Sequence, residues 1–164
     1  MVVLGIDPGI EKLGYSFIKS EKNNLTILSY GLITTKKEES KEIRFLQIYR
    51  DLETLLDRVK PDYIAVESLI FAKNVKTALV ISEIRGIIIL LSALNKIPLF
   101  EFTPLQVKMA ITGYGRSSKS QIQKAVKTLL NLSEAPSPDD ISDAIAVSIC
   151  GVNSILFQNR IKGC

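Results

Sequence analysis

Residues 2–9 read Val-Val-Leu-Gly-Ile-Asp-Pro-Gly, and this stretch decides the fold. Five residues without charge, Val2 to Ile6, are typical of a central strand that is covered on both faces of a sheet. Asp7 then opens a favourable turn sequence, Asp-Pro-Gly. An acid in this place is either a plain turn residue or part of a site at the edge of the sheet, and both interpretations stay open at this point.

Outward from this strand, the pattern predicts two more early strands and then an alternation of helices and strands. Residues 13–20 and 25–35 read as strands between polar turns. Apolar periodicity and capping signals then predict helices at 40–59, 74–94, 104–112, 118–130 and 139–153, with strands at 63–66 and 97–102. We therefore expect one α/β domain over residues 1–164, with a mixed sheet of three antiparallel N-terminal strands followed by parallel strands, and helices on both faces.

Composition predicts a soluble protein with a core of its own. The chain has 164 residues, 46% of them hydrophobic, and 21 basic against 17 acidic residues for a net charge of +4. The longest uncharged apolar stretch, 86–95, is shorter than the ~20 residues of a membrane-spanning helix. No basic segment precedes the first strand, so we expect a cytoplasmic protein without a membrane partner, in which Cys150 and Cys164 are thiols.

The absence of histidine narrows the chemistry. A chain without histidine has no Ser-His-Asp triad, no Cys-His pair and no imidazole ligand for a metal. Its two cysteines, Cys150 and Cys164, do not suffice for a thiolate zinc site. Carboxylate acid–base chemistry and hard cations with oxygen ligands remain.

Four acids stand out by their places in the pattern. Asp7 and Glu67 each end an apolar strand, at the edge where open α/β sheets tend to place their sites. Asp140 and Asp143 are three residues apart and share a helix face. Asp143 begins an almost wholly apolar helical stretch, where an ionised carboxylate is costly unless it is paired. Asp139 and Asp140 are also explained by the positive end of the helix dipole, which favours acids in a first helical turn.

Four gathered acids require a counter-charge, because two carboxylates about 5 Å apart repel by roughly 3 kcal/mol at an effective dielectric of 20. Oxygen ligands favour Mg²⁺ or Mn²⁺, and two such ions form a known arrangement for phosphodiester cleavage. The hypothesis requires the four acids to meet in one pocket. Acids far from one another, or a lysine salt-bridged into their midst, would contradict it.

A basic stretch follows the last predicted strand. Residues 102–133 carry five basic side chains and no acid, which suits either a solvated face or a polyanion-binding surface. The basic residues are Lys108, Arg116, Lys119, Lys124 and Lys127. The segment 113–119 adds glycines that would let the backbone approach a phosphate, and hydroxyls that can donate to it.

Taken together, these motifs resemble the bacterial RuvC family of crossover junction endodeoxyribonucleases. The resemblance covers almost the whole chain and rests on segments in the family's order and approximate spacing: 5–9, Glu67 with 71–74, 85–86, 103–108, 113–116 with Lys119, and 140–144. It implies an RNase H-like fold, a homodimer, and two Mg²⁺ ions per active site, with Mn²⁺ as a substitute. It also implies paired nicks at four-way (Holliday) DNA junctions in recombination and repair, and a partnership with the RuvA-RuvB branch-migration complex.

The resemblance also assigns residues. Asp7, Glu67, Asp140 and Asp143 match the family's catalytic and metal-binding acids, and Asp139 matches none. Lys108 and Lys119 match basic residues near the scissile phosphate, and Arg116 is expected to bind DNA. At the position where relatives often carry a base-stacking aromatic residue, this chain has Ile70, followed by Phe71. Phe71 therefore either binds DNA by stacking or packs in the core.

Three alternatives remain beside this interpretation. A related RNase H-like nuclease that processes ribosomal RNA precursors shares the Asp-x-Gly opening. A junction-binding module without catalysis, and a phosphate-binding half of an actin-like ATPase, belong to other classes. The apolar segment 84–91 around Gly86 is also open to two interpretations, as core or as a dimer interface.

Overall fold

The computed structural model describes residues 1–22, 24–68 and 75–162. The elements in these ranges are, in chain order, β1 (Val2–Asp7), β2 (Lys12–Glu21), β3 (Asn24–Thr34), α1 (Lys41–Val59), β4 (Tyr63–Glu67), α2 (Val75–Asn95), β5 (Leu99–Phe102), α3 (Pro104–Thr112), α4 (Lys119–Leu129) and α5 (Asp139–Lys162). Every predicted element is confirmed in type and order. The predicted N-cap Thr103 is also confirmed, because its side chain accepts a hydrogen bond from the backbone N–H of Gln106.

The strands form one mixed sheet in the order β3-β2-β1-β4-β5 within the described residues. β1 pairs antiparallel with β2, and β2 pairs antiparallel with β3. β4 lies parallel to both β1 and β5. β1 is therefore central, as its unbroken apolar run predicts, and the expected mixed sheet is confirmed.

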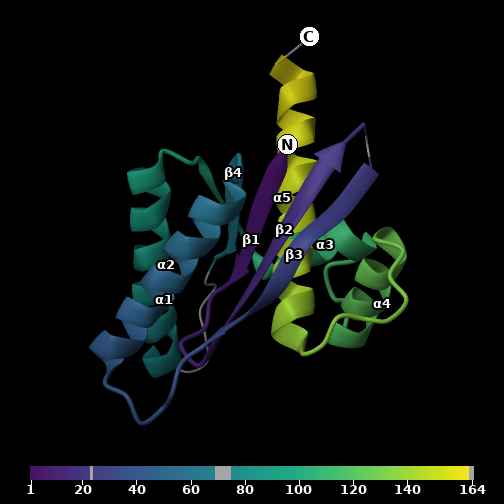
Figure 1. The fold of residues 1–164 in the computed structure, drawn as a ribbon. Helices are drawn as coiled ribbons and strands as arrows, with labels where there is room; N and C mark the ends of the chain where they lie inside the picture. The colour runs from purple at the N-terminus through teal and green to yellow at the C-terminus, as the bar shows by residue number, and fades with distance from the viewer. Residues whose placement is uncertain (23, 69–74, 163–164) are drawn as a thin grey trace.

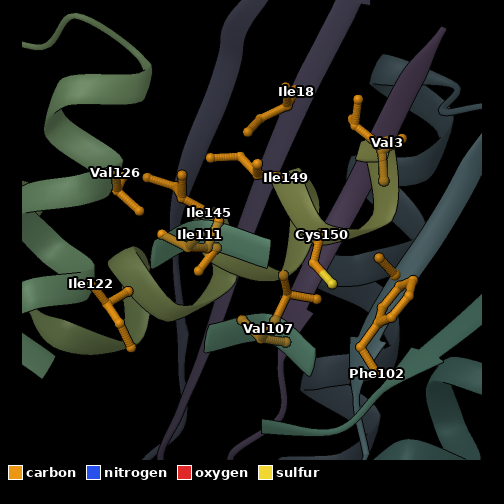
Figure 2. Packing of buried hydrophobic residues seen from close by; sticks show 14 of the residues in the cluster. Val3, Ile18, Phe102, Val107, Ile111, Ile122, Val126, Ile145, Ile149 and Cys150 are labelled. Carbon is orange, nitrogen blue, oxygen red and sulfur yellow. The ribbon is translucent and has the colours of Figure 1, made fainter. Parts of the chain in front are cut away.

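Helices cover both faces of the sheet, as predicted (Figure 1). On one face, α1 and α2 pack over a buried cluster that includes Leu4, Phe17 and Ile88. On the other face, α5 lies against the sheet, with α3 and α4 packed on its far side. Figure 2 shows this second cluster, in which Ile145, Ile149 and Cys150 of α5 meet residues of the strands and of α3 and α4.

Two glycines let α5 approach the sheet closely. A Cβ atom on Gly5 of β1 would overlap the Ser148 hydroxyl and would lie 2.5 Å from the Ala144 carbonyl oxygen. A Cβ atom on Gly14 of β2 would overlap the backbone oxygen of Asp140, at the start of α5. The Ser148 hydroxyl donates to the Ser16 carbonyl at 3.0 Å, which fixes the helix to β2. The N-terminal end of α5 is thus held against the strands that flank Asp7.

Two bounds differ from the sequence prediction by more than one residue. α5 continues to Lys162, nine residues beyond the expected end at residue 153. Residues 154–162 hold no proline or glycine, so nothing in the chain stops the helix where its apolar pattern fades. β5 begins at Leu99 and not at residue 97, because Lys96 takes a left-handed conformation after α2 and Pro98 has no N–H for the ladder.

Among the described residues, α2 and α5 are each long and apolar enough to cross a membrane. The expectation from the uncharged stretch 86–95 alone was therefore too narrow. For α5, 67% of the apolar window is buried inside the molecule, which identifies it as a core helix. For α2 the buried share is 22%, with Ile84, Ile88 and Leu91 facing the core and Ile89 and Leu90 exposed. The segment 84–91 is thus core on one side only.

Gly14→Ala should destabilise the fold by about 1–3 kcal/mol or more, because the added methyl group collides with backbone that cannot move without shifting α5. Urea unfolding followed by circular dichroism measures the loss. Gly86→Ala is the control, since a Cβ atom there has no neighbour within 4 Å and a helical Gly→Ala change gains about 0.5–1 kcal/mol. Equal stability of the two variants would contradict the close approach at Gly14.

Candidate active site

Asp7 and Glu67 lie side by side at one edge of the sheet. They are the last residues of β1 and β4, and the parallel register pairs Ile6 with Val66, the residues just before them. Neighbouring parallel strands end at the same edge of the sheet, so the two carboxylates lie close to each other there. Both side chains are partly buried.

The start of α5 brings two further acids to this edge. Gly14 is the β2 partner of Asp7 in the antiparallel register. A Cβ atom on Gly14 would overlap the backbone oxygen of Asp140, so the start of α5 lies directly over this pair. The Ser142 hydroxyl donates to the Pro136 carbonyl at 2.9 Å and so fastens the first turn of the helix to the preceding loop. Asp140 and Asp143 therefore begin α5 next to the end of β1, on the sheet face opposite α1 and α2.

The pKa values show that these carboxylates share one electrostatic environment. The pKa of Asp7 is raised to about 7, first by burial and then by the charges of Glu67, Asp143 and Asp140. Burial, followed by the Asp143 charge, raises the pKa of Glu67. Burial is also the largest cause of the raised pKa of Asp143, where nearby acids add to it and Lys119 opposes it. The site carries more negative charge than its lysines balance.

Glu67 and Asp143 share a cleft with two lysines. A hollow of about 310 Å³ is lined by Glu67, Asp143, Lys108 and Lys119, with Pro104, Val107 and Ile122 as its apolar wall. The structure thus places Lys108 and Lys119, two residues of the basic stretch, beside two of the acids. A phosphate in this cleft would meet two ammonium groups beside two carboxylates.

Asp140 lines a different, neighbouring cleft. This hollow of about 580 Å³ lies between residues 9–12 and the first turns of α2, with Asp140 at its side. In the described ranges, no three acidic or cysteine side chains converge closely enough to hold one metal ion as they stand. The described residues therefore do not form the single pocket predicted for all four acids: Glu67 and Asp143 line one cleft, Asp140 lines another, and Asp7 lines neither.

A lysine does reach one of the acids. Lys119 Nζ lies 3.2 Å from Asp139 Oδ2 and 3.8 Å from Asp143 Oδ2. This contact partly contradicts the expectation that no lysine is salt-bridged among the carboxylates. However, the Lys119 side chain is 67% exposed and approaches from the rim, and the pKa values of Asp7, Glu67 and Asp143 remain raised in its presence. The ammonium offsets part of the negative charge and does not replace a cation among the acids.

The donor set suits a hard divalent cation. Every candidate ligand is a carboxylate oxygen, and Mg²⁺ is bound through one or a few carboxylates together with water and phosphate oxygens. Burial, followed by mutual repulsion, raises the pKa values of Asp7 and Glu67, and a dication between the carboxylates would favour their ionised forms.

The glycine-rich segment 113–119 has structural roles that the sequence did not reveal. Gly113 caps α3 in a left-handed conformation, and a Cβ atom on Gly115 would overlap Leu105. The buried Ser117 hydroxyl donates to the Tyr114 carbonyl at 2.7 Å, and the Ser118 side chain caps α4. These groups hold the loop together, which leaves Arg116 and Lys119 as its candidates for phosphate contact.

Other predicted residues fall outside this cleft. Arg116 is exposed on the loop before α4 and does not line the hollow with Glu67. Phe71 and Ile70 lie outside the described residues, so the choice between stacking and packing for Phe71 stays open. Sequence reasoning missed Lys12 and Lys76, which line the second cleft, and the pairing of Asp139 with Lys119. Only proximity in space distinguishes these residues from ordinary surface charges.

Comparisons with known proteins agree with this geometry. Residues 3–151 match the family described as "Crossover junction endodeoxyribonuclease RuvC". Proteins of that name from Caldicellulosiruptor saccharolyticus and Alkaliphilus oremlandii are 48% and 47% identical to this chain. The alignments cover 96% and 99% of this chain and 98% and 99% of the relatives. The structure of Thermus thermophilus RuvC in complex with Holliday junction substrate matches with a TM-score of 0.91 at 28% identity, over 96% of both chains.

A central strand that ends in an acid, a parallel neighbour that ends in another, and a helix that brings two more define the class of RNase H-like proteins. Within that class, the match over residues 3–151 and the full-length relatives place the chain plainly: it belongs to the RuvC family of crossover junction endodeoxyribonucleases. Membership over nearly the whole chain favours this family over the three alternatives that the residues alone left open.

Asp7→Asn should stabilise the protein in EDTA, and the gain should grow with pH. The folded-state pKa of Asp7, about 7, lies above its ordinary value of 3.8, so the cost of ionising it builds up between pH 4 and 7 and is complete above pH 7. We expect equal melting temperatures near pH 4 and a variant that melts several degrees higher at pH 8. Asp57→Asn, at an exposed acid of α1, is the control. A pH-independent difference would contradict the raised pKa of Asp7 in the folded protein.

Proposed function

We propose that this protein is an endonuclease that resolves four-way DNA junctions by paired, symmetric nicks in homologous recombination and DNA repair. The observation that carries the proposal is the cleft in which Glu67 and Asp143 meet Lys108 and Lys119, next to Asp7 with its raised pKa. Family membership supports the substrate, since the RuvC of Thermus thermophilus has been solved in complex with Holliday junction substrate.

Asp7, Glu67, Asp140 and Asp143 are the residues that would hold Mg²⁺, with two ions per site and Mn²⁺ as a substitute. The chemistry that such ions supply when bound is activation of water for in-line attack and stabilisation of the departing 3′ oxygen, which leaves 3′-hydroxyl and 5′-phosphate ends. The carboxylates of this chain supply the negative charge and the orientation that such ions need. Burial and mutual repulsion raise the pKa values of Asp7 and Glu67, and a bound dication would offset this cost of ionisation.

Lys108 and Lys119 act on the phosphate. Both ammonium groups line the cleft beside Glu67 and Asp143, so they can bind the non-bridging oxygens and stabilise the charge that develops during cleavage. Lys119 is no general base, because hydrogen bonding to Asp139 raises its pKa further above the ordinary lysine value and keeps it protonated. Arg116, exposed on the loop before α4, and Phe71 are further proposed DNA contacts.

The proposed function also implies partners, first of all a second copy of this chain. Paired nicks require two sites, and the exposed side of α2 offers a surface for a second copy of the chain. Leu79, Leu90 and Leu94 recur there at helical spacing and are exposed. A dry interface also accounts for the many apolar residues of α2 that the monomer leaves outside its core. The RuvA-RuvB complex and a cytoplasmic location complete the proposal.

Asp7→Asn and Asp143→Asn should each lower Mg²⁺-dependent cleavage of a mobile four-way junction at least about a hundredfold, because each removes a ligand charge from the metal site. Binding of the junction in Ca²⁺ should change little. Gel mapping of both nicked strands measures the first effect and fluorescence anisotropy the second. An Asn variant with full activity would remove that residue from the mechanism.

A substrate panel completes this experiment. The wild-type protein should cut the four-way junction with Mg²⁺ and not in EDTA, and it should leave a structured RNA precursor and linear duplex DNA intact under the same conditions. Efficient RNA cleavage would favour an RNA-processing nuclease instead. Tight junction binding without any nicking would favour a binding module.

Leu90→Glu should convert a dimer to a monomer, because it places a charge in the proposed apolar interface on α2. Sedimentation velocity measures the change in mass. Leu28→Glu on β3 is the control: Leu28 is 47% exposed, close to the 53% of Leu90, but lies at the far edge of the sheet. A dimer that survives Leu90→Glu but not Leu28→Glu would move the interface to β3.

A further inference from the structure

In the proposed function, the long and exposed side chain of Lys119 must hold its ammonium group at the scissile phosphate. It is the first residue of α4, and 67% of its side chain is accessible to solvent. A free lysine explores many rotamers, so an ammonium that stabilises a developing charge works better when something holds it in place. The structure contains such a partner outside the four predicted acids.

Asp139 binds the ammonium from the side. Lys119 Nζ donates to Asp139 Oδ2 at 3.2 Å, and Gln123 Nε2 donates to the other oxygen, Oδ1, at 2.8 Å. Gln123 lies four residues after Lys119, so the two side chains leave the same face of α4. Gln123 therefore orients the Asp139 carboxylate, which lies at the first residue of α5 and binds the Lys119 ammonium.

The two acids near Lys119 are not equivalent. The distance from Nζ to Asp143 Oδ2 is 3.8 Å, longer than the 3.2 Å to Asp139 and beyond hydrogen-bond range. Asp143 faces the cleft with Glu67, whereas Asp139 is not among the residues that line it. If Asp143 binds another group in the cleft, Asp139 still binds the Lys119 ammonium.

We propose that Asp139, oriented by Gln123, is a positioning residue that holds the Lys119 ammonium at the mouth of the cleft, where it meets the scissile phosphate. This inference rests on the proposed nuclease function and on the role of Lys119 in it. Both oxygens of Asp139 are used by the neighbouring side chains, which separates it from the acids that are available to a metal. Its role goes beyond the favourable interaction of an acid with a helix N-terminus.

A double-mutant cycle tests the proposal. Single-turnover cleavage of a pre-bound four-way junction is measured in Mg²⁺ for the wild type, Asp139→Ala, Lys119→Ala and the double variant, with junction affinity in Ca²⁺ as the second readout. We expect Asp139→Ala to slow cleavage about 5- to 50-fold with less than a twofold change in affinity. In the Lys119→Ala background, the Asp139→Ala change should cause no further loss.

Further variants separate positioning from a purely structural effect. Gln123→Ala should slow cleavage less than Asp139→Ala, and Asp139→Glu should recover part of the lost rate because it keeps the charge. Glu134→Ala, an exposed acid in the loop before α5, should cleave like the wild type. Circular dichroism at the assay temperature confirms that every variant is folded.

Three outcomes would overturn the inference. Full activity of Asp139→Ala would show that Lys119 needs no such partner. Losses that multiply in the double variant would show that Asp139 acts independently of Lys119. Full activity of Lys119→Ala would remove the group that is to be positioned, although the nuclease function would stand. A wild-type protein that leaves the junction intact would instead refute the proposed function itself.

Discussion

The whole arrangement depends on the close contact between α5 and the two central strands. Gly5 on β1 and Gly14 on β2 leave room for the helix backbone, and the Ser148 hydroxyl ties the helix to β2. With a side chain at either glycine the helix would stand farther from the sheet. Asp140 and Asp143 would then begin too far from Asp7 to share its electrostatic environment. One packing contact thus serves both the core and the acids.

Gathering the acids has an energetic cost that the rest of the fold offsets. Burial and mutual repulsion raise the pKa values of Asp7, Glu67 and Asp143, so their ionised forms oppose folding near neutral pH. Two apolar clusters, one on each face of the sheet, supply the compensating stability. The site is therefore a strained region on a well-packed support, which is the usual relation between chemistry and core in an enzyme.

Much of this was predictable from the sequence. Unbroken apolar runs identified the central strands, and an acid at the end of each identified Asp7 and Glu67 as neighbours at one edge. The buried helix after Asp143 marked that residue as unusual, and the structure places it by the cleft with Lys119. Each of these inferences uses local pattern and the geometry of parallel strands, which is why it holds.

What the sequence could not predict depends on contacts in space. The roles of Gly5 and Gly14 require knowledge of which helix lies over them. The partnership of Asp139 with Lys119 joins residues 20 positions apart, and an acid at a helix N-terminus is too common to attract notice. The division of Asp140 from Glu67 and Asp143 between two clefts depends on side-chain directions. Phe71 lies outside the described residues, so its role remains a prediction.

The length of α5 has a consequence for how such a protein can evolve. One rigid rod carries the acids at its first turn and inserts Ile145, Ile149 and Ile155 into the interior farther along. If a change of volume among these interior residues turned the rod by about 20°, its Cα atoms would move by about 0.8 Å, a displacement of the size that impairs catalysis. Drift in the interior of this protein is therefore constrained by its chemistry, even at positions that no substrate ever touches.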